Sequence, residues 1–124
     1  MKSEDIQVVA FEIILHSGNA RTMVHKAFEA MREKNFKLSN ENLKLSNDEL
    51  LLAHKSQTNL LQEYAEGSHI DMEIILVHAQ DHLMTTMTLR EMAIEMQTLY
   101  EEVQDIEKRN QTRGQKGHRI SSMV

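Results

Sequence analysis

The stretch LVHAQDHLMTTMTLREMAIEMQTLYEEV (residues 76–103) decides the fold, because it reads as one long helix with apolar side chains on two sides. At about 100° per residue, one stripe of this helix contains Met72, Leu76, Ala79, Leu83, Met87 and Ile94. A second stripe, well round the cylinder, contains Ile74, Met92, Met96, Leu99 and Val103. A helix in a small bundle needs one apolar stripe for its own core. The second stripe therefore predicts self-association of the chain.

The rest of the 124 residues also favours long helices, since the chain has no proline and only four glycines. We expect helices over residues 4–34, about 39–67 and about 69–106, the second beginning near Ser39 or, alternatively, at the capping box SNDE that opens with Ser46. The predicted inward residues of the first two helices are Ile6, Val9, Ile13, Ala20, Val24, Ala27, Met31, Leu50, Ala53, Leu60, Leu61 and Tyr64. Short polar connections between them predict an all-α, up-down-up three-helix bundle.

Individual polar and glycine positions refine this prediction. Gly18 lies inside the first helix, where it predicts either a bend or a close approach of other atoms to the backbone. Gly67 is the expected C-cap of the second helix. Asp71 and Glu73 are expected in the first turn of the third helix, where the helix dipole favours anions.

Composition excludes several classes of protein. The absence of cysteine rules out disulfides and thiolate chemistry and favours a reducing compartment. No segment approaches the roughly 20 apolar residues of a membrane span, and the start of the chain does not resemble a signal peptide. A net charge of −5 argues against a general nucleic-acid binder. Residues 108–124 differ from residues 1–107 in being basic, and we expect them to form a flexible tail outside the helical domain.

A polar cluster interrupts the apolar pattern of the third helix. His78, Asp81, His82 and Thr85 have the spacing of residues on one helical face, and that face is the one with the second apolar stripe. The cluster is therefore expected in or beside an oligomer interface. A carboxylate buried there needs a proton, a counter-charge or a metal. Copies of Asp81 around a symmetry axis could share a hard cation such as Mg²⁺ or Ca²⁺, while pairing with a neighbouring residue is an equally good explanation.

The two histidines of this cluster allow three interpretations. A neutral imidazole is a nucleophile near neutral pH, and a pair at positions i and i+4 can bind zinc. A purely structural role in an oligomerisation module is the third. The remaining histidines give weaker signals: His16 and His54 are expected to be hydrogen-bonded in the interior, His25 and His69 to lie at the surface, and His118 to lie in the tail.

The segment LVHAQDHLMT (residues 76–85) resembles the signature of the lactose/cellobiose-type enzyme IIA components of the bacterial phosphoenolpyruvate-dependent sugar phosphotransferase system. Two further segments, ILHSGNAR (residues 14–21) and LAHKSQT (residues 52–58), agree with the same family in the same order. The resemblance covers about residues 6–104. The polar region 37–48 and the basic tail depart from it, which leaves the detail of partner recognition open.

This resemblance implies a cytoplasmic phosphocarrier that is a homotrimer of three-helix subunits, a bundle of nine helices in all. It implies that His78 accepts a phosphoryl group from the histidine-containing phosphocarrier protein and passes it to a cysteine of enzyme IIB, for uptake of a β-linked disaccharide. Asp81 corresponds to the metal-binding residue on the trimer axis, with Mg²⁺ or another divalent cation shared by three subunits. Gln80 and His82 match the motif and are expected to line the phosphoryl site. The alternative is a helical zinc-binding or oligomerisation protein.

Overall fold

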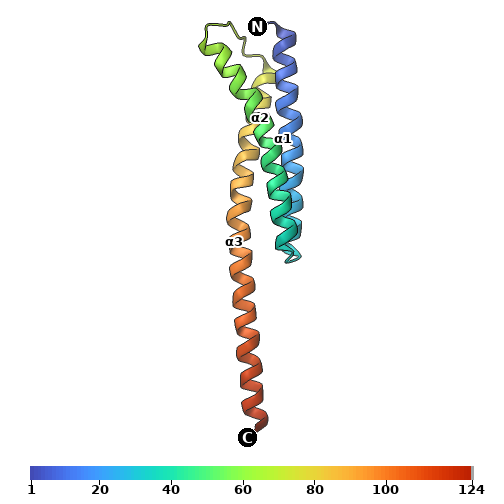
Figure 1. Ribbon diagram of the computed structural model, residues 1–124, viewed down its shortest axis with the longest axis vertical. Helices are drawn as coiled ribbons and strands as arrows, with labels where there is room; N and C mark the ends of the chain where they lie inside the picture. Colours follow the sequence, from blue (N-terminus) through green and yellow to red (C-terminus); the bar gives the residue numbers. More distant parts are fainter. Residues whose placement is uncertain (124) are drawn as a thin grey trace.

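The chain folds into three α-helices, as the computed structural model shows (Figure 1). The helices are α1 (Ser3–Arg32), α2 (Phe36–Ala65) and α3 (Ile74–Met123). The structure describes the backbone of residues 1–123 and the side chains of residues 1–114. Over that part of the chain no strand occurs, so the predicted all-α, up-down-up bundle is confirmed. None of the described helices is long and apolar enough to cross a membrane.

The core has two apolar clusters along the bundle. One lies toward the α2–α3 connection and contains Ile13, Leu60 and Leu83 among its buried side chains. The other lies toward the α1–α2 turn, where Met31, Leu43 and Ala93 are buried. Most of the inward residues expected on α1 are fully buried, which confirms the apolar stripe of that helix.

Four residues expected to face the core are instead exposed. Leu61 and Tyr64 lie on the last turns of α2 and are 54% and 67% exposed. Met72 precedes the first residue of α3 and is 65% exposed, and Ile94 is 41% exposed. The inward face of α3 continues past Leu83 through Thr86, Arg90, Ala93 and Gln97. Because three of these four are polar, hydrophobicity alone did not mark the buried side of the helix.

The ends of α1 and α2 have the same backbone geometry. At the end of α2 the N–H groups of Gly67 and Ser68 donate to the carbonyl oxygens of Tyr64 and Glu63, both at 3.1 Å. This is a Schellman motif, and Gly67 has the positive φ of 100° that it requires. The predicted C-cap role of Gly67 is thus confirmed.

The end of α1 repeats this motif with a non-glycine residue. Asn35 N–H donates to Ala30 O at 2.9 Å and Lys34 N–H to Met31 O at 3.0 Å. Lys34 has a φ of 61°, a conformation that costs an L-residue about 1–2 kcal/mol. The motif reverses the chain within three residues, and α2 begins directly afterwards.

The observed start of α2 is earlier than either predicted start. Asn35 is its N-cap, and its side-chain oxygen accepts the Leu38 N–H at 3.2 Å. The capping-box interpretation of Ser46 is wrong, because Ser46 is buried inside the helix and its hydroxyl donates to Leu43 O at 2.6 Å. The predicted first turn of the third helix is also wrong, since Asp71 and Glu73 both precede α3.

The longest helix, α3, continues to Met123 instead of ending near residue 106 as expected (Figure 1). Its 50 residues correspond to ~75 Å at 1.5 Å per residue, against ~45 Å for the 30 residues of α1. An ion pair of 2.8 Å between Lys34 Nζ and Glu107 Oε2 joins the α1–α2 turn to α3. Beyond this pair α3 runs past the other two helices. The predicted division at residue 107 into domain and flexible tail stays a prediction.

Candidate functional site

The candidate site is centred on His78 and His82, one turn apart in the first half of α3. His78 is exposed and His82 is half-buried. Their rings are 6.1 Å apart between centroids and meet edge to face, with an interplanar angle of 75°. The helix therefore presents one imidazole to solvent and holds a second beside it.

The buried edge of His82 has an unmet hydrogen-bonding requirement. Its Nδ1 atom is buried, and no hydrogen-bond partner for it occurs in the described part of the chain. Burying a polar atom without a partner costs free energy. A partner from outside this single chain, either a ligand or a second protein, would remove that cost.

Asp81 and Thr85 complete the polar face that the sequence predicted. Both side chains are exposed in the single chain. The Thr85 hydroxyl donates to the carbonyl oxygens of Asp81 at 2.8 Å and His82 at 3.3 Å, so it bonds to its own helix and leaves the Asp81 carboxylate free of it. Among the described side chains no group of three histidine or acidic residues could hold a metal ion.

Gln80 does not join this face within one chain. Residues two positions apart on a helix are separated by about 200° around its axis. Gln80 therefore points to the opposite side of α3 from His78. There it lines a groove of about 260 Å³ between α2 and α3, together with the apolar side chains of Leu60, Tyr64 and Ile70. Any contact between Gln80 and the imidazole of His78 would require a second chain.

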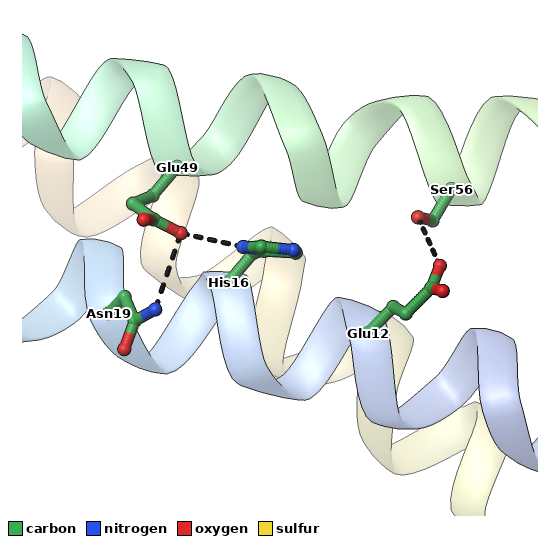
Figure 2. Close-up of polar contacts among 5 residues, drawn as sticks. All are labelled: Glu12, His16, Asn19, Glu49 and Ser56. Carbon is green, nitrogen blue, oxygen red and sulfur yellow. Dashed lines mark hydrogen bonds and ion pairs between the residues drawn. The ribbon is translucent and has the colours of Figure 1, made fainter.

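The other histidines fall into two groups. His16 Nδ1 lies 2.7 Å from Glu49 Oε2, and Asn19 donates to the same oxygen at 3.4 Å (Figure 2). A similar contact lies further along the two helices, where the Ser56 hydroxyl donates to Glu12 Oε2 at 3.1 Å. His16 is thus hydrogen-bonded and partly buried between α1 and α2, as expected.

The expectation for His54 is wrong, because its side chain is exposed on α2. His25 and His69 are exposed as predicted, and His118 lies outside the described side chains. Near His16, α1 continues without a break through Gly18, and a Cβ there would meet nothing within 4 Å. Close packing among the described residues therefore does not explain Gly18.

The second apolar stripe of α3 is exposed, as the sequence predicted. Met92, Leu99 and Val103 are 57%, 58% and 43% exposed, and Ile74 is 88% exposed. These side chains continue along α3 from the face of His78 toward the C-terminus of the helix. A contiguous apolar stripe of this kind is typical of a protein–protein contact.

The sequence analysis did not predict two polar contacts between α2 and α3 in the interior. The Arg90 side chain is half-buried, and its Nε donates to Leu43 O and Ser46 Oγ, which fastens α3 to α2. Ser39 and Gln97 are also buried and bonded to one another. Their spacing could have revealed them. Leu83, Arg90 and Gln97 follow one another at intervals of seven residues, so the two polar residues lie on the same side of α3 as the buried Leu83.

A three-helix chain with an exposed histidine in the motif LVHAQDHLMT defines a class of small helical phosphotransferase components, and comparisons with known proteins identify the family. Residues 8–101 match the family described as "PTS system, Lactose/Cellobiose specific IIA subunit". The chain belongs to this family of enzyme IIA components of the sugar phosphotransferase system, which confirms the predicted resemblance.

Two curated relatives support this assignment. The lichenan-specific phosphotransferase enzyme IIA component of Bacillus subtilis is 38% identical over 101 residues, which cover 82% of this chain and 92% of the relative. The lactose-specific EIIA component of Staphylococcus epidermidis is 34% identical over 100 residues, which cover 81% of this chain and 96% of the relative.

Solved structures agree in fold as well as in sequence. The crystal structure of PtcA from S. mutans is 67% identical, with a TM-score of 0.81, and covers 82% of this chain and 99% of that one. The cellobiose-specific enzyme IIA of Bacillus anthracis is 31% identical, with a TM-score of 0.79, and covers 85% and 94%. A solution structure of the chitobiose IIA protein in complex with HPr, from the Escherichia coli phosphotransferase system, is 30% identical, with a TM-score of 0.67, and covers 80% and 96%.

Proposed function

We propose that this chain is the phosphocarrier of a sugar phosphotransferase system and that His78 carries the phosphoryl group. The donor is HPr, the histidine-containing phosphocarrier protein, and the acceptor is a cysteine of the cognate enzyme IIB in the cytoplasm. The transported sugar is a β-linked disaccharide. The observation that carries the proposal is the exposed imidazole of His78 inside the motif LVHAQDHLMT. The existence of a complex between HPr and a 30% identical IIA protein supports the choice of donor.

The chemistry needs positioning more than covalent machinery. A lone pair on a ring nitrogen of neutral His78 attacks the phosphorus of the donor phosphohistidine in line, and a new P–N bond forms as the donor P–N bond breaks. In the second step a cysteine thiolate of enzyme IIB attacks the same phosphorus. An S–P bond forms, and His78 leaves as a neutral imidazole. His82 and, from a second chain, Gln80 are the proposed lining residues. The unpartnered Nδ1 of His82 can then find a partner in the assembled site.

The same proposal includes a homotrimer joined along the second apolar stripe of α3. Burying Met92, Leu99 and Val103 removes apolar surface from water, which favours association. Asp81 lies on the polar part of this face, so three copies would supply three carboxylates. A hard divalent cation such as Mg²⁺ accepts carboxylate oxygens together with water. When bound, it would offset the repulsion between the three charges.

Phosphate transfer through purified components tests the proposal. The full chain is incubated with phosphoenolpyruvate, enzyme I and HPr, and the product is examined by intact-mass spectrometry before and after mild acid treatment. We expect one acid-labile phosphoryl group per chain, absent in His78→Ala. A subsequent chase with unphosphorylated enzyme IIB should remove the group, because the cysteine thiolate accepts it.

A matched control uses His25→Ala, which removes another exposed helical histidine outside the motif. This variant should be phosphorylated like the parent chain. Circular dichroism of both variants checks that the helices persist. Phosphorylation of His78→Ala at the parent level would assign the phosphoryl group to another residue and overturn the proposal. Zinc bound tightly by His78 and His82, with no phosphotransfer, would favour the metal-binding alternative.

A further inference from the structure

A polar groove lies between α2 and α3, apart from the face of His78. Its volume is about 320 Å³, within the usual range of small-molecule sites. Lys44 and Arg90 supply two positive charges to its lining, and Asn40, Asn47 and Gln97 supply three carboxamides. By contrast, the groove that Gln80 lines further along the same two helices has mainly apolar side chains.

The groove opens on the side of α3 that the apolar stripe does not use. Ile94 lies on its wall. At about 100° per residue, Ile94 is roughly opposite Met96 and Val103 of the second stripe. Arg90 is twelve residues from His78, or ~18 Å along the helix. Association of copies through the stripe therefore leaves the groove open and separate from the phosphoryl site.

Arg90 is held in place as a cation without a counter-charge. Its Nε donates to Leu43 O at 3.1 Å and to Ser46 Oγ at 3.0 Å. Those bonds use one edge of the guanidinium and leave its terminal nitrogens available. Among the described side chains no carboxylate comes within 4.0 Å of Arg90 or of Lys44. A half-buried guanidinium of fixed orientation is a good receptor for an oxyanion, because its planar donors bind two oxygens at once.

The carboxamides offer hydrogen bonds of a different kind. Gln97 is only 8% exposed, and its Nε2 donates to Asn40 Oδ1 at 2.5 Å and to Glu101 Oε1 at 3.2 Å. These bonds orient the Asn40 amide and leave its own N–H donors unused. Asn47 adds a second amide on the same wall. Side-chain amides both donate and accept, which suits the hydroxyl groups of a polyol.

We propose that this groove binds the phosphate monoester of a small polyhydroxylated metabolite, with the phosphate on Arg90 and Lys44 and the hydroxyls on Asn40 and Asn47. The ligand class follows from the pairing of two cations with adjacent amides in a groove too large for inorganic phosphate alone. The site does not depend on phosphorylation of His78, so the proposal goes beyond the phosphocarrier function and is tested without it.

Isothermal titration calorimetry of the full chain with glucose 6-phosphate as probe tests the site. Inorganic phosphate and glucose, at matched ionic strength, form two separate arms. We expect glucose 6-phosphate to bind more tightly than either. Lys44→Gln should weaken binding about tenfold, the effect of losing one charge-assisted hydrogen bond. Arg90→Lys should weaken it as well, since the planar fork is lost while the charge remains.

The matched control is Lys55→Gln. It removes one positive charge, as Lys44→Gln does, but at an exposed position of α2 three turns beyond Lys44. It should leave the affinity unchanged. Backbone amide spectra by NMR check the fold of each variant and locate the shifts produced by the probe. Equal affinity for inorganic phosphate and glucose 6-phosphate would overturn the polyol part of the proposal. No binding at millimolar concentration, or binding indifferent to Lys44→Gln, would overturn it entirely.

Discussion

At the residue scale, a substitution at Asp81 distinguishes the contribution of the proposed cation to the assembly from the contribution of apolar packing. Asp81→Leu replaces carboxylates that repel one another in the proposed trimer with apolar side chains. We expect the trimer to persist or become more stable, because such replacements of charged groups at interfaces are often neutral or stabilising. The proposed Mg²⁺ should no longer bind, because its carboxylate ligands are removed. Light scattering gives the mass of the assembly, and elemental analysis of the dialysed protein gives its metal content.

Asp48→Leu is the control for this substitution, since Asp48 is an exposed carboxylate on α2 away from the polar face of α3. It should change neither mass nor metal content. If Asp81→Leu instead dissociates into single chains, the cation and not the apolar stripe holds the copies together.

The sequence predicted the exposed polar face residue by residue better than it predicted the buried face. The spacing of His78, Asp81 and Thr85 placed them together because helical periodicity is independent of context. The buried positions of Thr86 and Gln97 could not be recognised from hydrophobicity. Helical periodicity also places Gln80 opposite His78, whereas the family motif had suggested that both line one site. In the proposed trimer, the lining residues of one site would come from different chains, which a motif along one chain does not show.

At the scale of the helical elements, the turn between α1 and α2 contains avoidable strain. Lys34 occupies the left-handed position of the Schellman motif that Gly67 occupies at the end of α2. Lys34→Gly should therefore be more stable than Lys34→Ala by about 1 kcal/mol, because only glycine adopts this φ without steric cost. Urea unfolding followed by circular dichroism at 222 nm measures the difference.

Both variants lose the ion pair between Lys34 and Glu107, so its contribution cancels in the difference between their free energies of unfolding. That pair is about half exposed at both ends, so its contribution is small. Equal stability of the two variants would mean that the positive φ at residue 34 costs nothing in the folded chain.

The helix boundaries illustrate what local sequence signals can and cannot decide. Gly67 marked the end of α2 because glycine adopts the positive φ of a helix C-terminus without steric cost. The sequence offered Ser39 and the capping-box pattern at Ser46 as starts of α2, and the earlier of the two is nearer to the observed N-cap, Asn35. Packing decided between them, since the helix before Ser46 buries Ser39, Asn42 and Leu43 against its neighbours. No glycine or proline lies between residue 106 and Arg113, and so nothing in that segment of the sequence ends α3.

At the scale of the whole molecule, the exposed stripe of α3 predicts the assembly. Light scattering in solution should give ~43 kDa, three times the 14.4 kDa of one chain. Leu99→Glu should lower this mass toward that of a single chain, because it places three carboxylates within the proposed contact. Thr112→Glu, on an exposed residue past Ile106 of the same helix, serves as the control. A single-chain mass for the parent protein at micromolar concentration would contradict the proposed trimer.

The part of α3 that runs past the other two helices, from about Glu107 to Met123, is called the overhang here. It also affects how this protein behaves during purification. A rod that projects beyond a compact body increases friction with the solvent, and the Stokes radius then exceeds that of a sphere of equal mass. Gel filtration calibrated with globular standards would therefore give too large an apparent mass, and the number of subunits would be overestimated. Sedimentation velocity should reveal the same elongation as a raised frictional ratio, and removing the overhang should bring that ratio down.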